Sequence, residues 1–116
     1  MISMTYEEIF TMIQQIGIPA VYNHWPDNTQ KAPPFICFYY PSSESFFADN
    51  LNYCKIENLY IELYTANKDF DAEKQVEAVL RENSLTYSRS ETYLNSEKLY
   101  MELYTMEVYI DGSESE

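Results

Sequence analysis

Two glutamates are the first candidates for acid–base or metal chemistry, because each lies between two tyrosines in a motif that occurs twice. Residues 59–65 read Leu-Tyr-Ile-Glu-Leu-Tyr-Thr, and residues 99–105 read Leu-Tyr-Met-Glu-Leu-Tyr-Thr. If the two segments form neighbouring strands, Glu62 and Glu102 could face each other and shift each other's pKa. Acid–base or metal chemistry would also need a histidine or further ligands, and neither motif contains them. We therefore expect both glutamates on a solvated or subunit-facing side of a sheet.

The other groups with chemical potential are isolated in the sequence. His24 is the single histidine and has no partner at the spacing of a metal site. Ser42, Ser43 and Ser45 lack the glycines of a nucleophile elbow. With two glycines in the whole chain, a glycine-rich phosphate loop is absent. The sequence predicts no catalytic residue, no metal and no cofactor, and hence a protein that is not an enzyme.

The charge balance restricts the partners that the protein can have. Nineteen acidic and seven basic residues give a net charge of −12. This balance argues against sequence-specific binding of nucleic acid and against attachment to anionic membranes, both of which need clusters of Lys and Arg. An acidic surface keeps a protein soluble, and it could also let a DNA duplex slide past without sticking. The 12 tyrosines suit strands and also surfaces that meet other proteins.

The start of the chain and the two cysteines suggest a cytoplasmic setting. The opening Met-Ile-Ser-Met-Thr-Tyr-Glu-Glu lacks the basic and apolar regions of a signal peptide. No apolar run approaches the roughly 20 residues that span a bilayer. Cys37 and Cys54 form no CxxC pair and lie in apolar segments, where a free thiol acts as a small hydrophobic group. We expect a soluble protein with reduced thiols.

The first part of the chain predicts a helix and two strands. Residues 5–16 form a helix, because Thr5 and Glu8 make a capping box and Gly17 supplies the stop. Its apolar stripe consists of Tyr6, Ile9, Phe10, Ile13 and Ile16. Residues 20–24 predict a short edge strand between prolines, and residues 35–40 a well-covered strand that Pro41 closes.

Residues 42–52 have no clear period and are expected to form a polar loop. Phe46 and Phe47 lie inside it, followed by Asp49. An aromatic side chain on a mobile loop is a candidate partner contact. The alternative is that both phenylalanines fold back as a local plug under the core.

The second part predicts two long strands, a helix and a shorter strand. The expected strands cover residues 53–65, 85–91 and 97–110, and the expected helix covers residues 70–83. Asp69 is placed to cap the helix, and Asn95-Ser96 is a turn signal. The chain is therefore predicted to be α+β, a mostly antiparallel sheet with two helices packed on one face. We expect one domain over residues 1–112 and a disordered acidic tail over residues 113–116.

Alternation along the twin strands predicts which face each side chain takes. The aliphatic side of both strands is expected to hold the helices, and the Tyr/Glu side is expected to be free. After Thr105 the alternation slips, because Met106, Val108 and Ile110 take the opposite parity. Either a bulge near Thr105 or cover by a neighbouring subunit would explain the slip. The candidate subunit or partner contacts are Phe46, Phe47, Asp49, Tyr60, Glu62, Tyr64, Tyr100, Glu102 and Tyr104.

Several segments together resemble a known protein family. They are the first helix ending in Gly17-Ile18-Pro19, the strand opening Pro33-Pro34-Phe35-Ile36, the segment Phe47-Ala48-Asp49-Asn50, the strand end Ile61-Glu62-Leu63-Tyr64-Thr65, the helix with Glu73, Val76 and Leu80, and Glu97 before the last strand. Over nearly its whole length the chain resembles short prophage and tailed-phage proteins of Gram-positive bacteria that are similar to tail terminator proteins, also called tail-completion or head–tail joining proteins.

The resemblance implies a virion structural protein. Such proteins form a ring, typically a hexamer, on the end of the tail tube, stop its growth and offer the surface to which the head attaches. The implied partners are further copies of the chain, the tail tube protein and the head connector protein. The implied locations are the host bacterial cytoplasm during assembly and the virion tail. The alternatives are a monomeric acidic module that mimics DNA and inhibits a basic host or phage protein, and, least favoured, a small enzyme.

Overall fold

The computed structural model describes residues 3–24, 32–48 and 52–111, with side chains for all of these except residues 46–48 and 52–54. The described part contains six strands and two helices, which confirms the predicted α+β class. In chain order they are β1 (Ser3–Met4), α1 (Tyr6–Gln14), β2 (Ala20–Tyr22), β3 (Phe35–Ala48), β4 (Asn52–Thr65), α2 (Phe70–Glu82), β5 (Ser88–Leu94) and β6 (Leu99–Ile110). The predicted acidic tail lies outside the described residues.

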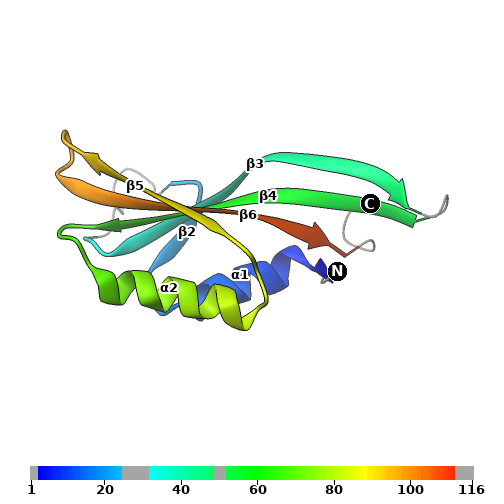
Figure 1. Ribbon diagram of the computed structural model, residues 1–116, viewed down its shortest axis with the longest axis horizontal. Coiled ribbons are helices and arrows are strands. Elements are labelled where there is room, and N and C mark those ends of the chain that lie inside the picture. Colours follow the sequence, from blue (N-terminus) through cyan, green and yellow to red (C-terminus); the bar gives the residue numbers. More distant parts are fainter. Residues whose placement is uncertain (1–2, 25–31, 49–51, 112–116) are drawn as a thin grey trace.

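The strands form one twisted, mostly antiparallel sheet in the order β1-β6-β4-β3-β2. β4 pairs with β6 along one edge, and β5 and β1 share the other edge of β6 at its two ends. The short strands β1 and β2 pair in parallel with β6 and β3. Both helices cover the same side of the sheet, and the β3–β4 hairpin reaches beyond them (Figure 1). The resulting molecule measures 50 × 29 × 22 Å.

Helix α1 begins and ends as its sequence predicts. The Thr5 amide donates to Glu8 Oε1 at 2.9 Å, and the Glu8 amide donates to Thr5 Oγ1 at 3.0 Å. Gly17 has a φ of +86°, a conformation that glycine adopts without strain. Ile9, Ile13 and Ile16 are buried as expected.

The expected position of Phe10 is wrong. Its side chain is 42 % exposed, and the buried Met12 fills the core instead. Successive helical residues are rotated by about 100°, so Phe10 lies at the rim of a stripe centred on Ile9 and Ile13.

Removing the cap of α1 is expected to have a modest cost. Thr5→Ala should lower the free energy of unfolding by about 1 kcal/mol, because the Glu8 amide loses its acceptor. Urea unfolding followed by circular dichroism measures the change. Thr5→Ser, which keeps the hydroxyl, should retain most of the stability. An unchanged midpoint for Thr5→Ala would contradict the role of the cap.

Helix α2 also follows its prediction. The Ala72 amide donates to Asp69 Oδ1 at 3.0 Å, which places the cap at the expected residue. The buried apolar residues of the helix are Ala72, Val76, Val79 and Leu80, as predicted. Together with α1 and the facing strand residues, this side forms the hydrophobic core. The core therefore lies between the two helices and one face of the sheet.

The expected loop over residues 42–52 is wrong, since β3 continues through Pro41 to Ala48. The register shifts between Tyr39 and Ser42, which marks an irregularity around Pro41. Proline has no amide to donate, and a bulge lets it remain in a strand. Backbone pairing then resumes from Ser42↔Asn58 to Ala48↔Asn52. Phe46 and Phe47 are therefore strand residues, although their side chains, like the whole of Asp49, lie outside the described part.

The strand predicted over residues 85–91 lies three residues too early. β5 covers Ser88–Leu94 rather than residues 85–91, because the turn before β6 brings Leu94 opposite Leu99. Lys98 completes that turn with a φ of +55°. Leu85 and Tyr87 precede the strand and pack against the core from the connecting segment.

The expected faces of the second twin strand are wrong. β4 and β6 pair without interruption from Lys55↔Ile110 to Thr65↔Tyr100. This register sets Glu62 opposite Leu103 and Glu102 opposite Leu63. Because side chains alternate between faces, the two copies of the motif present opposite sides to the helices.

No bulge occurs at Thr105, so one parity holds along the whole of β6. The buried residues of this strand are Glu102, Tyr104, Met106, Val108 and Ile110. They lie on the helix-covered side with Leu59, Ile61 and Leu63 of β4. The Leu and Met residues of the second motif face the other way.

Candidate interaction surface

The side of the sheet that faces away from both helices is named the open face here. Its central residues are Phe35, Cys37, Tyr39, Tyr60, Glu62, Tyr64, Met101 and Leu103. Alternation along β3, β4 and β6 brings them together, since their sequence neighbours point into the core. In the described part of the chain, neither helix covers this face (Figure 1).

Glu62 lies at the centre of the open face and is held by two tyrosines. The Tyr39 hydroxyl donates to Glu62 Oε2 at 2.6 Å, and the Tyr64 hydroxyl donates to Glu62 Oε1 at 2.6 Å. None of the ion pairs among the described residues involves Glu62. The carboxylate is thus oriented by hydroxyl donors and keeps acceptor capacity on both oxygens.

Aromatic rings surround this carboxylate. The rings of Phe35 and Tyr64 stack with centroids 4.9 Å apart, and those of Tyr39 and Tyr60 lie 5.6 Å apart. Phe35 and Cys37 are only 5 % and 6 % exposed, since the tyrosines shield them. Burial, and then the charge of Glu62, raise the pKa of the Cys37 thiol to about 11, which keeps it protonated and unreactive. The open face is therefore aromatic, and its tyrosines shield Phe35 and Cys37 from water.

Several tyrosines hold their protons more tightly than free tyrosine does. Burial raises the pKa of Tyr39 and Tyr64, and their hydrogen bonds to Glu62 raise it further. Burial and a hydrogen bond to Glu77 do the same for Tyr104. Burial is also the main cause of the raised pKa values of Tyr6 and Tyr40.

These shifts predict that the tyrosines with raised pKa values resist ionisation at alkaline pH. A group whose pKa is raised by folding makes its full contribution to stability at pH values below its pKa in the unfolded chain. This contribution is lost as the pH rises through its pKa in the folded protein. Of the tyrosines whose side chains the structure describes, we expect the five with raised pKa values to stay protonated above about pH 10 until the protein unfolds. Tyrosinate absorbance measured alongside circular dichroism tests this. Complete ionisation of a still-folded protein near pH 10 would contradict it.

A charged cluster lies on the helix-covered side, around the second motif. Glu102 is 1 % exposed and forms an ion pair with Arg89 of β5. Lys68 Nζ lies 2.6 Å from Glu73, 2.5 Å from Glu91 and 3.5 Å from Glu102. The cluster thus pairs three carboxylates with two cations, which offsets part of the cost of burying Glu102.

The three carboxylates of this cluster have the spacing of metal ligands. One oxygen each from Glu73, Glu91 and Glu102 lies within 4.8 Å of the others. The Lys68 ammonium sits among them at ion-pair distance. It therefore supplies the positive charge that such a group requires, and the cluster acts as a structural ion-pair network.

The structure separates the residues that the sequence grouped. Tyr60, Glu62 and Tyr64 lie on the open face, the side of β4 that was expected to be free of the helices. Glu102 and Tyr104 are buried beneath α2, where the Tyr104 hydroxyl donates to Glu77 Oε2 at 2.9 Å. Tyr100 packs against Tyr93 of β5 on the same side, with ring centroids 4.9 Å apart. The expectation that the Tyr/Glu side of both motifs is free is therefore wrong for the second motif.

Sequence reasoning missed the open-face partners from β3 and the cations of the charged cluster. Tyr39 is 23 residues from Glu62, and Lys68 is 34 residues from Glu102. No local spacing signals such contacts. Strict alternation along residues 35–39 is the one signal that could have placed Tyr39 beside Tyr60, given the strand pairing.

A surface groove of about 680 Å³ continues the open face at one end. Its walls include Asn58, Tyr60, Glu107 and the segment 84–88. The groove runs along the part of β6 between its pairings with β5 and β1. The open face therefore has a groove at one end in addition to its aromatic centre.

Among the described residues, neither helix has the length and apolar character that crossing a membrane requires.

Comparison with known proteins gives a likeness in structure. No protein family model matches the sequence, and no curated protein matches it significantly. The fold is similar to that of a chain in the solved virion of a native gene transfer agent (GTA) particle, with a TM-score of 0.57. The two sequences are 11 % identical, and the aligned region covers 87 % of this chain and 84 % of that chain. The two chains therefore share a fold over most of their lengths.

Proposed function

We propose that this protein is a structural component of a phage-like virion, and specifically that it forms the ring that ends the tail tube and joins it to the head. The observation that carries the proposal is the shared fold with a chain of a gene transfer agent virion, which extends over most of both chains. The sequence resemblance to tail terminator proteins supports the finer assignment.

The surface chemistry is compatible with a protein that works by contact. A ring needs complementary patches on each subunit. The open face offers a group of aromatic side chains around one carboxylate that two tyrosine hydroxyls orient, and aromatic residues are enriched at the centres of protein interfaces. The net charge of −12 would let such a ring surround DNA without binding it. We propose no catalytic role for the protein.

The proposed partners follow from this role. Copies of the chain would form the ring, with the tail tube protein on one side and the head connector protein on the other. Assembly would take place in the bacterial cytoplasm, and the finished ring would remain in the virion tail.

Deletion of the gene from the strain that encodes it tests the proposal. Electron microscopy of the resulting lysate should show separate heads and tails, with tails of uncontrolled length. A plasmid copy of the gene should restore joined particles. Normal joined particles from the deletion strain would refute the proposed function.

An acidic inhibitor that mimics DNA would need free carboxylates spread over one convex face. Many of the described carboxylates are instead held by internal partners, namely Glu57, Glu62, Glu73, Glu91 and Glu102. This arrangement favours the structural role.

A further inference from the structure

The strands direct negative charge, and no positive charge, to the open face. Side chains that lie opposite each other in a strand pair share a face, so the strand registers place Glu44, Glu62 and Glu107 on the open face. The cations of the described strands are Lys55 and Arg89, and the same registers place both on the helix-covered face. The described strands therefore present three carboxylates and no cation on the open face.

These carboxylates keep their charge for another molecule. None of the ion pairs among the described residues includes Glu44, Glu62 or Glu107. Glu44 and Glu107 are exposed, and Glu62 is partly exposed. Each oxygen of Glu62 accepts one tyrosine hydroxyl, which leaves each oxygen able to accept one more donor. Two parallel N–H groups, as in a guanidinium, match a carboxylate in this state.

The aromatic rings beside Glu62 favour arginine among the possible cations. The ring centroids of Tyr39 and Tyr60 are 5.6 Å apart, and the Tyr39 hydroxyl itself contacts Glu62. A guanidinium stacks on aromatic rings and is more weakly hydrated than an ammonium group, so it loses less on leaving water for such a surface. Glu62 thus combines the charge and the ring contacts that bind an arginine side chain.

The groove of about 680 Å³ indicates how a bound chain would run. Its walls include Tyr60 and Glu107, and Tyr60 is two residues from Glu62 on the same face of β4. Glu107 lies four residues along and one strand across from Glu62, so their Cα atoms are roughly 14 Å apart, too far to share one metal ion. An extended chain covers this distance in about four residues. A segment with two basic residues at that spacing therefore reaches both carboxylates.

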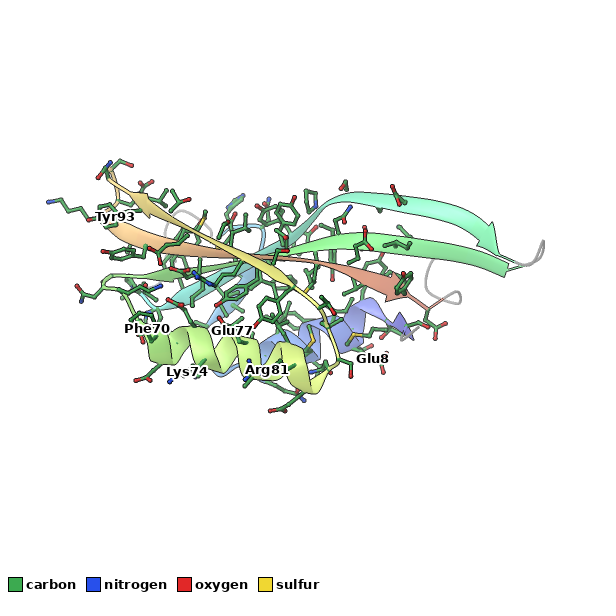
Figure 2. The ribbon with its side chains drawn as sticks, viewed as in Figure 1. Glu8, Phe70, Lys74, Glu77, Arg81 and Tyr93 are labelled. Carbon is green, nitrogen blue, oxygen red and sulfur yellow. The ribbon has the colours of Figure 1, made fainter. Side chains whose placement is uncertain are left out.

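The described part of a second copy does not offer a basic segment. Three of its cations already form ion pairs with glutamates of their own chain, namely Lys55, Lys68 and Arg89. Lys74 and Arg81 lie along α2 with Glu77 between them in the chain (Figure 2). This helix has four acidic and two basic residues, so its surface has no excess of positive charge. Lys98 is a single cation in the β5–β6 turn. The charge of the open face therefore selects a different protein.

We propose that the open face binds an extended, arginine-bearing segment of another virion protein. One guanidinium pairs with Glu62 beside the rings of Tyr39 and Tyr60, and a second basic side chain of the segment pairs with Glu107. The inference rests on the proposed function and names the chemistry of the partner that this face recognises. Complementary charge also accelerates the encounter of the two proteins.

Binding of a model peptide to the purified full chain tests the recognised chemistry. The probe is a seven-residue glycine peptide with arginines at its second and sixth positions. At millimolar concentration it should shift the amide NMR signals of β4 and β6 around Glu62 and Glu107. Glu62→Gln should weaken binding at least roughly tenfold, because the guanidinium loses charge-assisted hydrogen bonds. The same peptide with citrulline in place of arginine keeps the shape without the charge and should not bind.

Two further variants separate recognition from the net charge and from misfolding. Glu107→Gln should weaken binding about threefold, the size of an exposed ion pair, and Glu107 makes no internal ion pair whose loss would disturb the fold. Glu82→Gln removes the same charge from an exposed position on α2 and should leave the affinity unchanged. Equal affinities of the Glu107→Gln and Glu82→Gln proteins, or no signal shift with the arginine peptide, would overturn the proposed chemistry.

Photo-cross-linking in assembling cells tests the occupant. With p-benzoylphenylalanine in place of Tyr60, the chain should cross-link to a different virion protein at a segment that contains arginine. Adding Glu62→Gln should reduce this product. The same photoreactive residue in place of Phe70, which is 65 % exposed on α2, is the matched control and should not give it.

The outcomes separate this inference from the proposed function. If the chain is present in particles but position 60 cross-links to a second copy, or to nothing, the proposed partner is wrong and the virion role stands. If the chain is absent from particles, the virion role itself fails, whatever the peptide shows. A cross-link to an arginine-bearing segment of another virion protein that depends on Glu62 supports the inference.

Discussion

Leu63→Ala is expected to lower the free energy of unfolding by about 3 kcal/mol, whereas Leu103→Ala should cost about 1 kcal/mol or less. The two leucines hold the same position in the repeated motif, between glutamate and tyrosine. Leu63 is fully buried among the helix-facing core residues, and Leu103 is partly exposed on the open face. Truncating the first leaves a cavity, while water and neighbouring side chains can fill the space left by the second.

Urea unfolding of the two purified variants measures this difference. Because residue type and local sequence context are matched, the comparison tests the face on which each leucine lies. Ile61→Ala is a positive control, since Ile61 is also fully buried. Equal losses for Leu63→Ala and Leu103→Ala would contradict the register in which β4 and β6 place the two motifs on opposite faces.

Arg89→Met is expected to lower the free energy of unfolding at neutral pH by about 3 kcal/mol, the lower end of the cost of breaking a buried ion pair. Glu102 is 1 % exposed and would keep only the more distant Lys68 as a counter-charge. The arginine is itself 39 % exposed at its side chain, so water compensates part of the loss. Lys98→Met, which removes an exposed cation from a turn, is the control and should change stability little.

The loss caused by Arg89→Met should depend on pH in a defined direction. Burial, and then the contact with Glu91, raise the pKa of Glu102 above its usual value. Removing Arg89 takes away a group that lowers this pKa, so the carboxyl of the variant is protonated more readily still. A group whose pKa is raised by folding contributes stability that is present below its pKa in the unfolded chain. This contribution is lost as the pH rises through its pKa in the folded protein. The loss of unfolding free energy in Arg89→Met should therefore be full at neutral pH. It should shrink as the pH falls towards the pKa of an ordinary glutamate.

Urea unfolding of Arg89→Met and of the unaltered protein at neutral and mildly acidic pH checks this direction. A deficit that grows on acidification would show that Arg89 acts through packing rather than through the charge of Glu102.

Local sequence signals predict the helix caps and the helix stop correctly. The Thr5–Glu8 capping box, the Asp69 cap and the stop at Gly17 depend on contacts within a few residues, and each lies where the sequence predicts it. Helical periodicity likewise identified the buried side of α2. Such signals are readable because they depend on the geometry of one turn. Of the candidate surface, Tyr60, Glu62 and Tyr64 were placed correctly by the alternation of a single strand.

The tertiary structure decided which side of the second motif is buried. Alternation fixes which residues share a face, but the covered face depends on partners elsewhere in the chain. In β6 the aliphatic side chains of Met106, Val108 and Ile110 face the helices, and an uninterrupted strand carries Glu102 and Tyr104 to the same side.

That choice buries a carboxylate, which is tolerable because Lys68 and Arg89 arrive from other segments to neutralise it. The same long-range pairing brings Tyr39 to Glu62 and so forms the open face. Burial, register and charge compensation are properties of the assembled sheet, and for that physical reason two nearly identical motifs have opposite roles: one on the surface, one in the core.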